Sequence, residues 1–388
     1  MERLPVLRPD LPNADRLLPY LRSIDASRIY SNHGPLASTL ERRLSDRLGL
    51  PAGGIVCASS GTSAIIGAVL AAAGRAHEER PFALIPAFTF VATALAIEQC
   101  GYRPYLADVD PDSWLLDPEK LLLHPQLKRF GVVVPVAPYG RPVPQEPWQT
   151  FRLRTNIPVV IDGGASFDTS LQEPDRYIGD VPVALSFHAT KCFSTGEGGA
   201  IASSDLTIVG RSMQALNFGF RTMRDSQMAS TNGKLSEYHA AVGLAELDGW
   251  LDKQSSLLTV VNLYRRLMDR ESISPSFYAA PDISKSYALF LCSSLDEAAE
   301  VTGSLDRHQI DCRLWYGTGV QGHTYFSAVC HDGLNISESL ASRLIGLPIS
   351  SDLTEGDVCR VVRALREGVR ASALRQNYVG NRPPSGDP

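Results

Sequence analysis

Short apolar runs alternate with helical patterns along the first 250 residues. The runs lie at residues 54–58, 82–86, 105–107, 132–136, 158–161 and 183–187. Strands that are apolar on both faces are typical of a sheet covered by helices on both sides, and the alternation with helices makes that sheet mostly parallel. The pattern therefore predicts an α/β fold, in which ligands bind at the carboxyl ends of the strands.

Two helical patterns frame this region. Leu36, Leu40, Leu44 and Leu48 share one stripe between Pro35 and Gly49, which predicts an amphipathic helix with both ends marked. A second pattern begins near residue 233 and continues to Leu251, where it meets the polar stretch 252–256. We place a domain boundary there.

The boundary divides the chain into a large domain of residues 1–251 and a smaller α+β domain of residues 252–372. A helix with a capping box is predicted in the small domain, from Thr354 with Asp357 in the usual Glu or Gln place. Residues 373–388 end in Asn-Arg-Pro-Pro-Ser-Gly-Asp-Pro and bury too little to order themselves, so we expect a flexible tail.

Composition narrows the class of protein. The 388 residues are 44% hydrophobic and 20% charged with a net charge of -5, which is ordinary for a globular protein and gives no reason to expect nucleic acid or a membrane as partner. The seven cysteines form no Cys-x-x-Cys pair, which argues against a structural zinc site or a disulfide framework. The N-terminal residues do not resemble a signal peptide. We expect a cytoplasmic protein with no metal.

Ser60-Gly61-Thr62-Ser63 follows the first apolar run and precedes a small-residue helix at 64–73. The free N–H groups and positive dipole end of such a helix bind phosphate, and Gly, Thr and Ser allow close approach. A plain helix N-cap is the alternative interpretation.

Lys191 stands between the apolar run 183–187 and the glycine-rich segment 196–199. A lysine fixed in this way can form a Schiff base, and the glycines let the backbone fold close to a planar ring. The alternative is a solvated lysine in a turn.

Asp162 follows the run 158–161 directly and precedes two glycines. Its carboxylate could face a pyridinium nitrogen, or it could cap the next turn. Phe88 and Phe90 could stack on such a ring, or they could belong to the core.

Residues 317–322 fit G-x-G-x-x-G literally, but they lie in the small domain without a following small-residue helix, so we do not interpret them as a dinucleotide site.

Several motifs occur in a fixed order between residues 30 and 250, with a weaker echo at Leu347-Pro348. They are Asn32-His33-Gly34-Pro35, Ser60-Gly61-Thr62-Ser63-Ala64, the segment 86–93, Asp108-Val109-Asp110, Ser186-Phe187-His188-x-x-Lys191 with Gly196-Glu197-Gly198-Gly199, Asn217-Phe218-Gly219 and Asn232-x-Lys234-Leu235-Ser236-Glu237. In these motifs the chain resembles the DegT/DnrJ/StrS family, which consists largely of pyridoxal-phosphate sugar aminotransferases.

The resemblance implies a fold-type-I aminotransferase and a set of site residues. Lys191 would form the Schiff base with pyridoxal 5'-phosphate, Asp162 would pair with the ring nitrogen, and Phe90 would stack on the ring. The phosphate would be held by Gly61, Thr62, Ser63 and Ser186, and by Asn232 from the other subunit of a homodimer with shared active sites. Lys234 could add a charge for the phosphate or for a substrate anion. Where the family often has Asp-Ala-Ala-Gln or Asp-Ala-Ala-His, this chain has Asp162-Gly163-Gly164-Ala165, so a contact from that position to the phenolic oxygen is not implied.

The resemblance also implies a reaction. L-glutamate would give its amine to the cofactor, and the product would aminate a nucleotide-linked keto-sugar, with a dTDP- or UDP-4-keto-6-deoxyhexose as acceptor. The alternatives are a 3-keto sugar, a cyclitol or another ketone as acceptor, and a non-catalytic pyridoxal-phosphate-binding regulator. The family's 3-dehydratases carry His where Lys191 stands, which argues against that activity.

Overall fold

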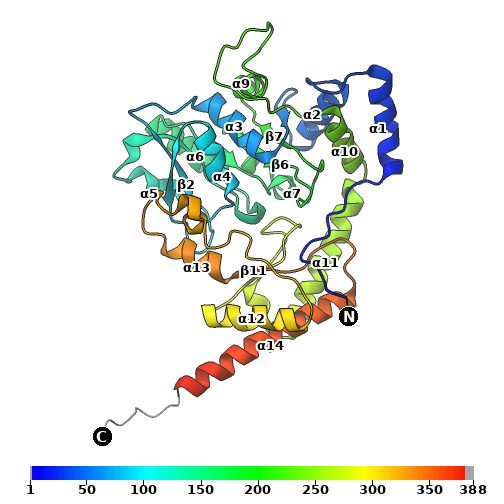
Figure 1. The fold of residues 1–388 in the computed structure, drawn as a ribbon, viewed down its shortest axis with the longest axis vertical. Helices are drawn as coiled ribbons and strands as arrows, with labels where there is room; N and C mark the ends of the chain where they lie inside the picture. The colour runs from blue at the N-terminus through cyan, green and yellow to red at the C-terminus, as the bar shows by residue number, and fades with distance from the viewer. Residues whose placement is uncertain (1, 381–388) are drawn as a thin grey trace.

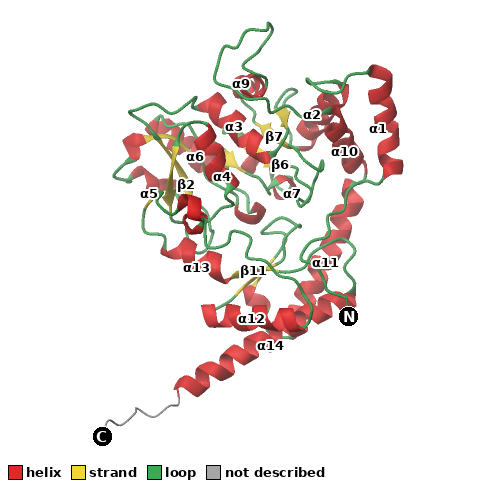
Figure 2. Cartoon of the chain, in the orientation of Figure 1, coloured by secondary structure: helices red, strands yellow, loops and turns green. Residues whose placement is uncertain are grey.

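A mostly parallel sheet with helices on both faces forms the large part of the molecule (Figures 1 and 2). The computed structural model describes residues 2–380. The strands of this sheet are β1 (Ile55–Ala58), β2 (Phe82–Pro86), β3 (Arg103–Ala107), β4 (Phe130–Val133), β5 (Ile161–Asp162), β6 (Val183–Ser186), β7 (Gly199–Ala202) and β10 (Cys330–His331). The predicted α/β class is confirmed.

The strands form two sets that meet at β4 and β5. One set has the order β10-β3-β2-β4 and is parallel throughout, and the other has the order β1-β7-β6-β5. Parallel bridges from Val133 to Val159 and from Val136 to Asp162 join the two sets. The strand β7, which the sequence analysis did not find, is antiparallel to both β1 and β6.

Alternate residues of each strand face opposite helical layers, as the pleat requires. The helices around this sheet are α1 (Ala14–Ser27), α2 (Pro35–Arg47), α3 (Gly61–Ala72), α4 (Ala92–Gln99), α5 (Pro118–Leu122), α6 (Gln145–Thr155), α7 (Phe167–Ser170), α8 (Pro174–Tyr177), α9 (Leu206–Leu216) and α10 (Glu237–Asp248), with short 3-10 turns η1 (Leu127–Arg129) and η2 (Pro138–Gly140). In β1, Ile55 and Cys57 belong to the core cluster that includes α2, α6 and α10, whereas Val56 and Ala58 belong to the one that includes α3, α4 and α9.

The C-terminal part is a small antiparallel sheet packed on helices. Its strands have the order β11 (Leu344–Gly346), β9 (Leu289–Leu291) and β8 (Phe277–Tyr278). The helices are α11 (Trp250–Arg270), α12 (Leu295–Arg307), α13 (Asn335–Arg343) and α14 (Glu355–Gly380), and the 3-10 turns are η3 (Ser274–Ser276), η4 (Val320–Gly322) and η5 (Thr324–Phe326). The predicted capping box is present, because Thr354 N–H donates to Asp357 Oδ2 at 3.1 Å and Asp357 N–H donates to Thr354 Oγ1 at 3.2 Å.

The domain limits expected after residues 251 and 372 stay a prediction, and three features of the structure are relevant to them. The polar stretch 252–256 lies inside the continuous helix α11, whose opposite face is buried through Leu257 and Val261. The N-terminal segment pairs with the C-terminal part, since parallel bridges join Leu4 to Ile310 and Leu7 to Ile349. The tail expected at 373–388 is helical to residue 380, and residues 381–388 lie outside the described residues.

The segment 317–322 ends in the 3-10 turn η4 rather than opening an α-helix. Within residues 2–380, no helix combines the length and apolar character that crossing a membrane requires. The same part of the chain contains no group of three or more His, Cys, Asp or Glu residues arranged to hold a metal ion.

Candidate active site

A cavity of about 480 Å³ opens at the carboxyl ends of the strands and is lined from both parts of the chain. Of the nine site residues that the resemblance implies, six line it: Gly61, Thr62, Phe90, Asp162, Ser186 and Lys191. The other three, Ser63, Asn232 and Lys234, are not among its lining residues in the part of the chain that the structure describes.

The N-terminus of α3 forms one wall. The sequence analysis placed a turn through Ser63 and a helix from residue 64, but the helix begins at Gly61, with Ser60 as N-cap accepting from Ser63 N–H at 3.0 Å. A Cβ on Gly61 would lie 2.6 Å from Cβ of Ser186, so only glycine allows α3 to approach β6 this closely. The first N–H groups of the helix, which have no partner within it, and its positive dipole end are features that suit an anion.

Ser63 strengthens the cap instead of lining the cavity. Its hydroxyl lies 3.0 Å from the hydroxyls of both Ser59 and Ser60. The plain N-cap interpretation of this serine cluster therefore describes Ser60 and Ser63, while Gly61 and Thr62, together with Ser60, line the cavity.

Asp162 ends β5 and is 8% exposed. Its carboxylate accepts hydrogen bonds from the Thr93 hydroxyl at 2.7 Å and from Gly164 N–H at 3.0 Å. Burial raises the pKa of Asp162, while these two donors and the positive charge of Lys191 oppose the rise. A cationic group in the cavity would therefore favour the ionised form of this carboxylate.

Lys191 lies on the loop that joins β6 to β7. Backbone hydrogen bonds from Ala189 N–H to Gly196 O and from Lys191 N–H to His188 O, both 2.8 Å, hold the loop closed. The Nζ atom lies 3.2 Å from the hydroxyl oxygen of Tyr287, a residue of the C-terminal part of the chain. The lysine is thus held from both sides of the cavity.

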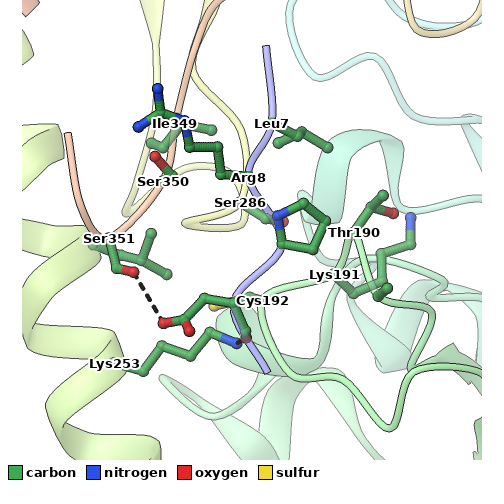
Figure 3. Close-up of a pocket in the computed structure, with 14 residues that line it drawn as sticks. Leu7, Arg8, Thr190, Lys191, Cys192, Lys253, Ser286, Ile349, Ser350 and Ser351 are labelled. Atoms are coloured by element: carbon green, nitrogen blue, oxygen red, sulfur yellow. Dashed lines mark hydrogen bonds between the residues drawn. The ribbon is translucent and has the colours of Figure 1, made fainter. Parts of the chain in front are cut away.

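A second, smaller cavity of about 40 Å³ lies on the other side of the Lys191 loop (Figure 3). Figure 3 shows the N-terminal segment with Leu7 and Arg8 running between that loop and the segment that carries Ile349, Ser350 and Ser351. Lys253 of α11 donates to Asp10 O at 2.6 Å, and the Ser351 hydroxyl donates to Asp10 Oδ2 at 3.1 Å. The N-terminal segment is therefore bonded to the C-terminal part of the chain and lines this cavity together with Lys191.

The two phenylalanines have different places. Phe88 is fully buried, with its ring against Trp114, Tyr139 and Tyr316. Phe90 is 58% exposed and lines the cavity. Phe88 is therefore a core residue, and Phe90 is the one whose face is free to stack on a ring.

Asn232 and Lys234 pair with each other outside the cavity. Lys234 Nζ donates to Asn232 Oδ1 at 2.7 Å and lies 4.3 Å from the centre of the Phe218 ring. Burial lowers the pKa of Lys234. A contact of Asn232 with the site of a partner subunit stays a prediction.

Several residues of the cavity were not predicted from the sequence. Thr93 and His188 belong to motifs of the resemblance but had no predicted role, whereas Tyr287, Arg313, Trp315 and Tyr316 come from the C-terminal part of the chain, where no chemical motif marked them. The Nδ1 atom of His188 lies 2.8 Å from Thr190 Oγ1, and its Nε2 atom lies 3.5 Å from Glu197. The one signal for Arg313, Trp315 and Tyr316 was their basic and aromatic character next to the glycines at 317–322, and Tyr287 had no such signal.

Comparison with known proteins adds the following matches. The model of the DegT/DnrJ/EryC1/StrS aminotransferase family matches residues 13–366. Protein Rv3402c of Mycobacterium tuberculosis is 31% identical over 381 residues, which cover 94% of this chain and 90% of that protein. The dTDP-4-amino-4,6-dideoxy-D-glucose transaminase of Shigella dysenteriae is 29% identical over 374 residues, with coverage of 93% and 98%. The crystal structure of DesI in the presence of its TDP-sugar product has a TM-score of 0.83 at 26% identity, with coverage of 98% and 96%.

Proposed function

Because this chain belongs to the DegT/DnrJ/EryC1/StrS aminotransferase family, we propose that it transfers the amine of L-glutamate to a keto group of a nucleotide-linked deoxysugar. The cofactor of this aminotransferase is pyridoxal 5'-phosphate, as in its family. The observation that carries the proposal is that Lys191, Asp162 and the N-terminus of α3 line one cavity.

The residues of the cavity fit this cofactor. The α3 N-terminus next to Ser186 suits a phosphate, and the space beside Gly61 is one that a Cβ would fill. The buried Asp162 carboxylate suits a cationic ring nitrogen, and Phe90 offers a free aromatic face. When bound, pyridoxal phosphate supplies an aldehyde for amines and a ring that withdraws electrons from the neighbouring carbon.

The protein's own part in the reaction is positioning and proton transfer. Lys191 Nζ removes the proton from the α-carbon of glutamate in the first half-reaction and delivers a proton to the sugar carbon that receives the amine in the second. Asp162, held by Thr93 and Gly164, supplies a fixed negative charge at the cavity floor.

Arg313 is our candidate for binding a carboxylate of the donor. It lines the cavity, and its guanidinium lies 4.9 Å from the centre of the Trp315 ring. No carboxylate within residues 2–380 forms an ion pair with it. Because a guanidinium binds a carboxylate through two parallel hydrogen bonds, Arg313 suits a dicarboxylic amino acid such as glutamate.

The acceptor that we propose is a dTDP- or UDP-4-keto-6-deoxyhexose. The name of the Shigella relative, which is a dTDP-sugar transaminase of similar length, supports a nucleotide sugar. A 3-keto sugar, a cyclitol or another ketone would use the same Lys191 chemistry, and a non-catalytic regulator would bind the cofactor without turnover. We also propose a cytoplasmic homodimer in which Asn232 and Lys234 serve the partner's cavity.

The experiment that tests the donor is the first half-reaction alone, followed by the absorbance of the bound cofactor after rapid mixing with L-glutamate. We expect conversion without any sugar present. Replacing Arg313 with Gln should raise the glutamate Kd about 10- to 100-fold, the size expected for a lost charge-assisted hydrogen bond, while Arg307→Gln, an exposed arginine that does not line the cavity, changes nothing. Absence of conversion with glutamate would contradict the donor assignment.

A further inference from the structure

Tyr287 is placed against the reacting atom of the site by a part of the chain almost 100 residues from Lys191. Its hydroxyl oxygen lies 3.2 Å from Lys191 Nζ, and the residue is 8% exposed. The ring packs edge-to-face against Tyr139 and Trp315, at centre distances of 5.3 and 5.6 Å. The ring is thus fixed, and the hydroxyl is aimed at the amine.

A hydroxyl suits an amine that changes its protonation state. Tyrosine O–H donates a hydrogen bond to a neutral amine, and the same oxygen accepts one from an ammonium group. The contact can therefore persist when Lys191 takes up a proton and when it gives the proton away. A flexible lysine side chain without this contact would have more rotamers to sample.

The turn that carries Tyr287 is anchored to the large domain by a buried carboxylate. Asp168, in α7 just after the strand that ends in Asp162, is 1% exposed. Its Oδ2 accepts from Lys285 N–H at 2.9 Å and lies 3.6 Å from Lys285 Nζ. The roles proposed for Lys191, Asp162 and Arg313 do not involve this buried ion pair.

The turn itself is closed by two further hydrogen bonds. Tyr287 N–H donates to Ser284 O at 3.0 Å, and Ser284 N–H donates to Tyr139 O at 2.9 Å. Tyr139 and Asp168 therefore hold the first two residues, Ser284 and Lys285, of a four-residue turn whose last residue is Tyr287. The short segment 162–168 therefore leads from the cavity carboxylate, Asp162, to Asp168, which holds the turn that carries Tyr287.

We propose that Tyr287 is a catalytic residue whose hydroxyl holds the Lys191 amine in the position from which it reacts. Asp168 is the positioning residue that keeps Tyr287 there through Lys285. The inference rests on the proposed function in one respect, since it takes Lys191 as the lysine that bonds to the cofactor.

The test uses Tyr287→Phe, which removes the hydroxyl oxygen and keeps the packed ring. The apoprotein should capture pyridoxal phosphate at Lys191 about 10- to 100-fold more slowly, the range expected when a hydrogen bond to a charged group is lost. Affinity for pyridoxamine phosphate, which cannot form a Schiff base with lysine, should stay unchanged. Tyr278→Phe, the same change at a tyrosine of β8 that does not line the cavity, is the matched control.

Asp168→Asn separates positioning from packing. Like Tyr287→Phe, it should lower the rate at which the apoprotein captures pyridoxal phosphate. In a Tyr287→Phe background it should have no further effect on that rate, because the hydroxyl that Asp168 positions is gone. Capture at the native rate by Tyr287→Phe, or a full Asp168→Asn effect in that background, would overturn the inference. In every variant, borohydride should fix the cofactor at Lys191, and a label at another lysine would overturn the proposed function as well.

Discussion

The Thr93 hydroxyl donates a 2.7 Å hydrogen bond to Oδ2 of Asp162, the carboxylate at the floor of the cavity. Thr93 itself lies 2.9 Å from the Thr89 hydroxyl, so the carboxylate is held by a short chain of hydroxyls from the segment after β2. The orientation of Asp162 is therefore fixed before any ligand binds, which leads to the first prediction.

Asp162→Asn should keep pyridoxal phosphate bound while slowing proton removal from glutamate by orders of magnitude, a barrier increase on the order of 3 kcal/mol or more. The reason is that Asn has the same size but no charge to favour a protonated ring nitrogen. The measurement is the single-turnover rate with glutamate, with cofactor content checked by absorbance. A near-native rate would return Asp162 to the role of a turn cap.

Gly61→Ala should weaken cofactor binding, because the added Cβ would lie 2.6 Å from Cβ of Ser186 and 2.9 Å from its Oγ. An overpacked contact of this kind costs about 1–3 kcal/mol, so we expect a Kd for pyridoxal phosphate about 10- to 100-fold higher, measured by fluorescence titration of the apoprotein.

Gly210→Ala is the matched control, since a Cβ there would meet nothing within 4 Å. Equal affinities in the Gly61 and Gly210 variants would show that the α3 N-terminus is not the phosphate site.

The start of α3 also shows what sequence patterns can and cannot resolve. The order of strands and helices followed from apolar runs, because burial on both faces leaves a clear pattern. The first turn of the helix did not, because Gly61, Thr62 and Ser63 have the composition of a loop, although in the structure they follow the Ser60 N-cap as the first residues of α3. β7 was missed because it begins at Gly199, the last glycine of the Lys191 loop, so its start has the composition of a turn.

The site residues from the C-terminal part of the chain could not be predicted from the sequence for a different reason. Tyr287 and Arg313 line the same cavity as Lys191 and Asp162 although they lie 96 to 151 residues further along the chain, and local periodicity carries no information about such distant pairs. Lys191, Asp162 and the α3 region were found because each stands at the end of a strand. Residues that approach the same cavity from the loops of a second domain follow no comparable rule.

Glu41 gives a prediction for the dependence of stability on pH. The residue accepts a hydrogen bond from Cys57 N–H at 2.8 Å, and burial raises its pKa from 4.5 to about 7, with the nearby Glu237 adding to the rise. Between pH 4.5 and 7 the folded protein therefore binds more protons at this site than the unfolded chain does. The free energy of unfolding should fall as the pH rises through this range.

Glu41→Gln should remove this fall in the free energy of unfolding, since the amide cannot ionise and its oxygen can still accept a hydrogen bond from Cys57 N–H. Relative to the native protein, the variant should gain at most about 3 kcal/mol of stability by pH 8. Urea unfolding at several pH values checks this, with Glu78→Gln, an exposed glutamate, as control. A parallel pH dependence for the native protein and Glu41→Gln would contradict the prediction.

The proposed sharing of sites between subunits can be tested by mixing two inactive chains. Asn232 is exposed and outside the cavity of its own chain, so in a shared-site dimer a Lys191→Ala chain and an Asn232→Ala chain together form one site with both native residues. Activity of the mixed dimer should recover toward half of the native value. Mixing restores nothing if each chain serves its own cavity.

The most direct test of the account is the identity of the aminated product. Purified protein would be given isotopically labelled L-glutamate (¹⁵N at the amine) and a panel of nucleotide keto-sugars, including dTDP- and UDP-4-keto-6-deoxyhexoses, and the products would be read by mass spectrometry. We predict that a nucleotide aminodeoxysugar carries the label and that Lys191→Ala forms none. Unlabelled sugars throughout the panel, or labelled product from the Lys191→Ala protein, would contradict the account.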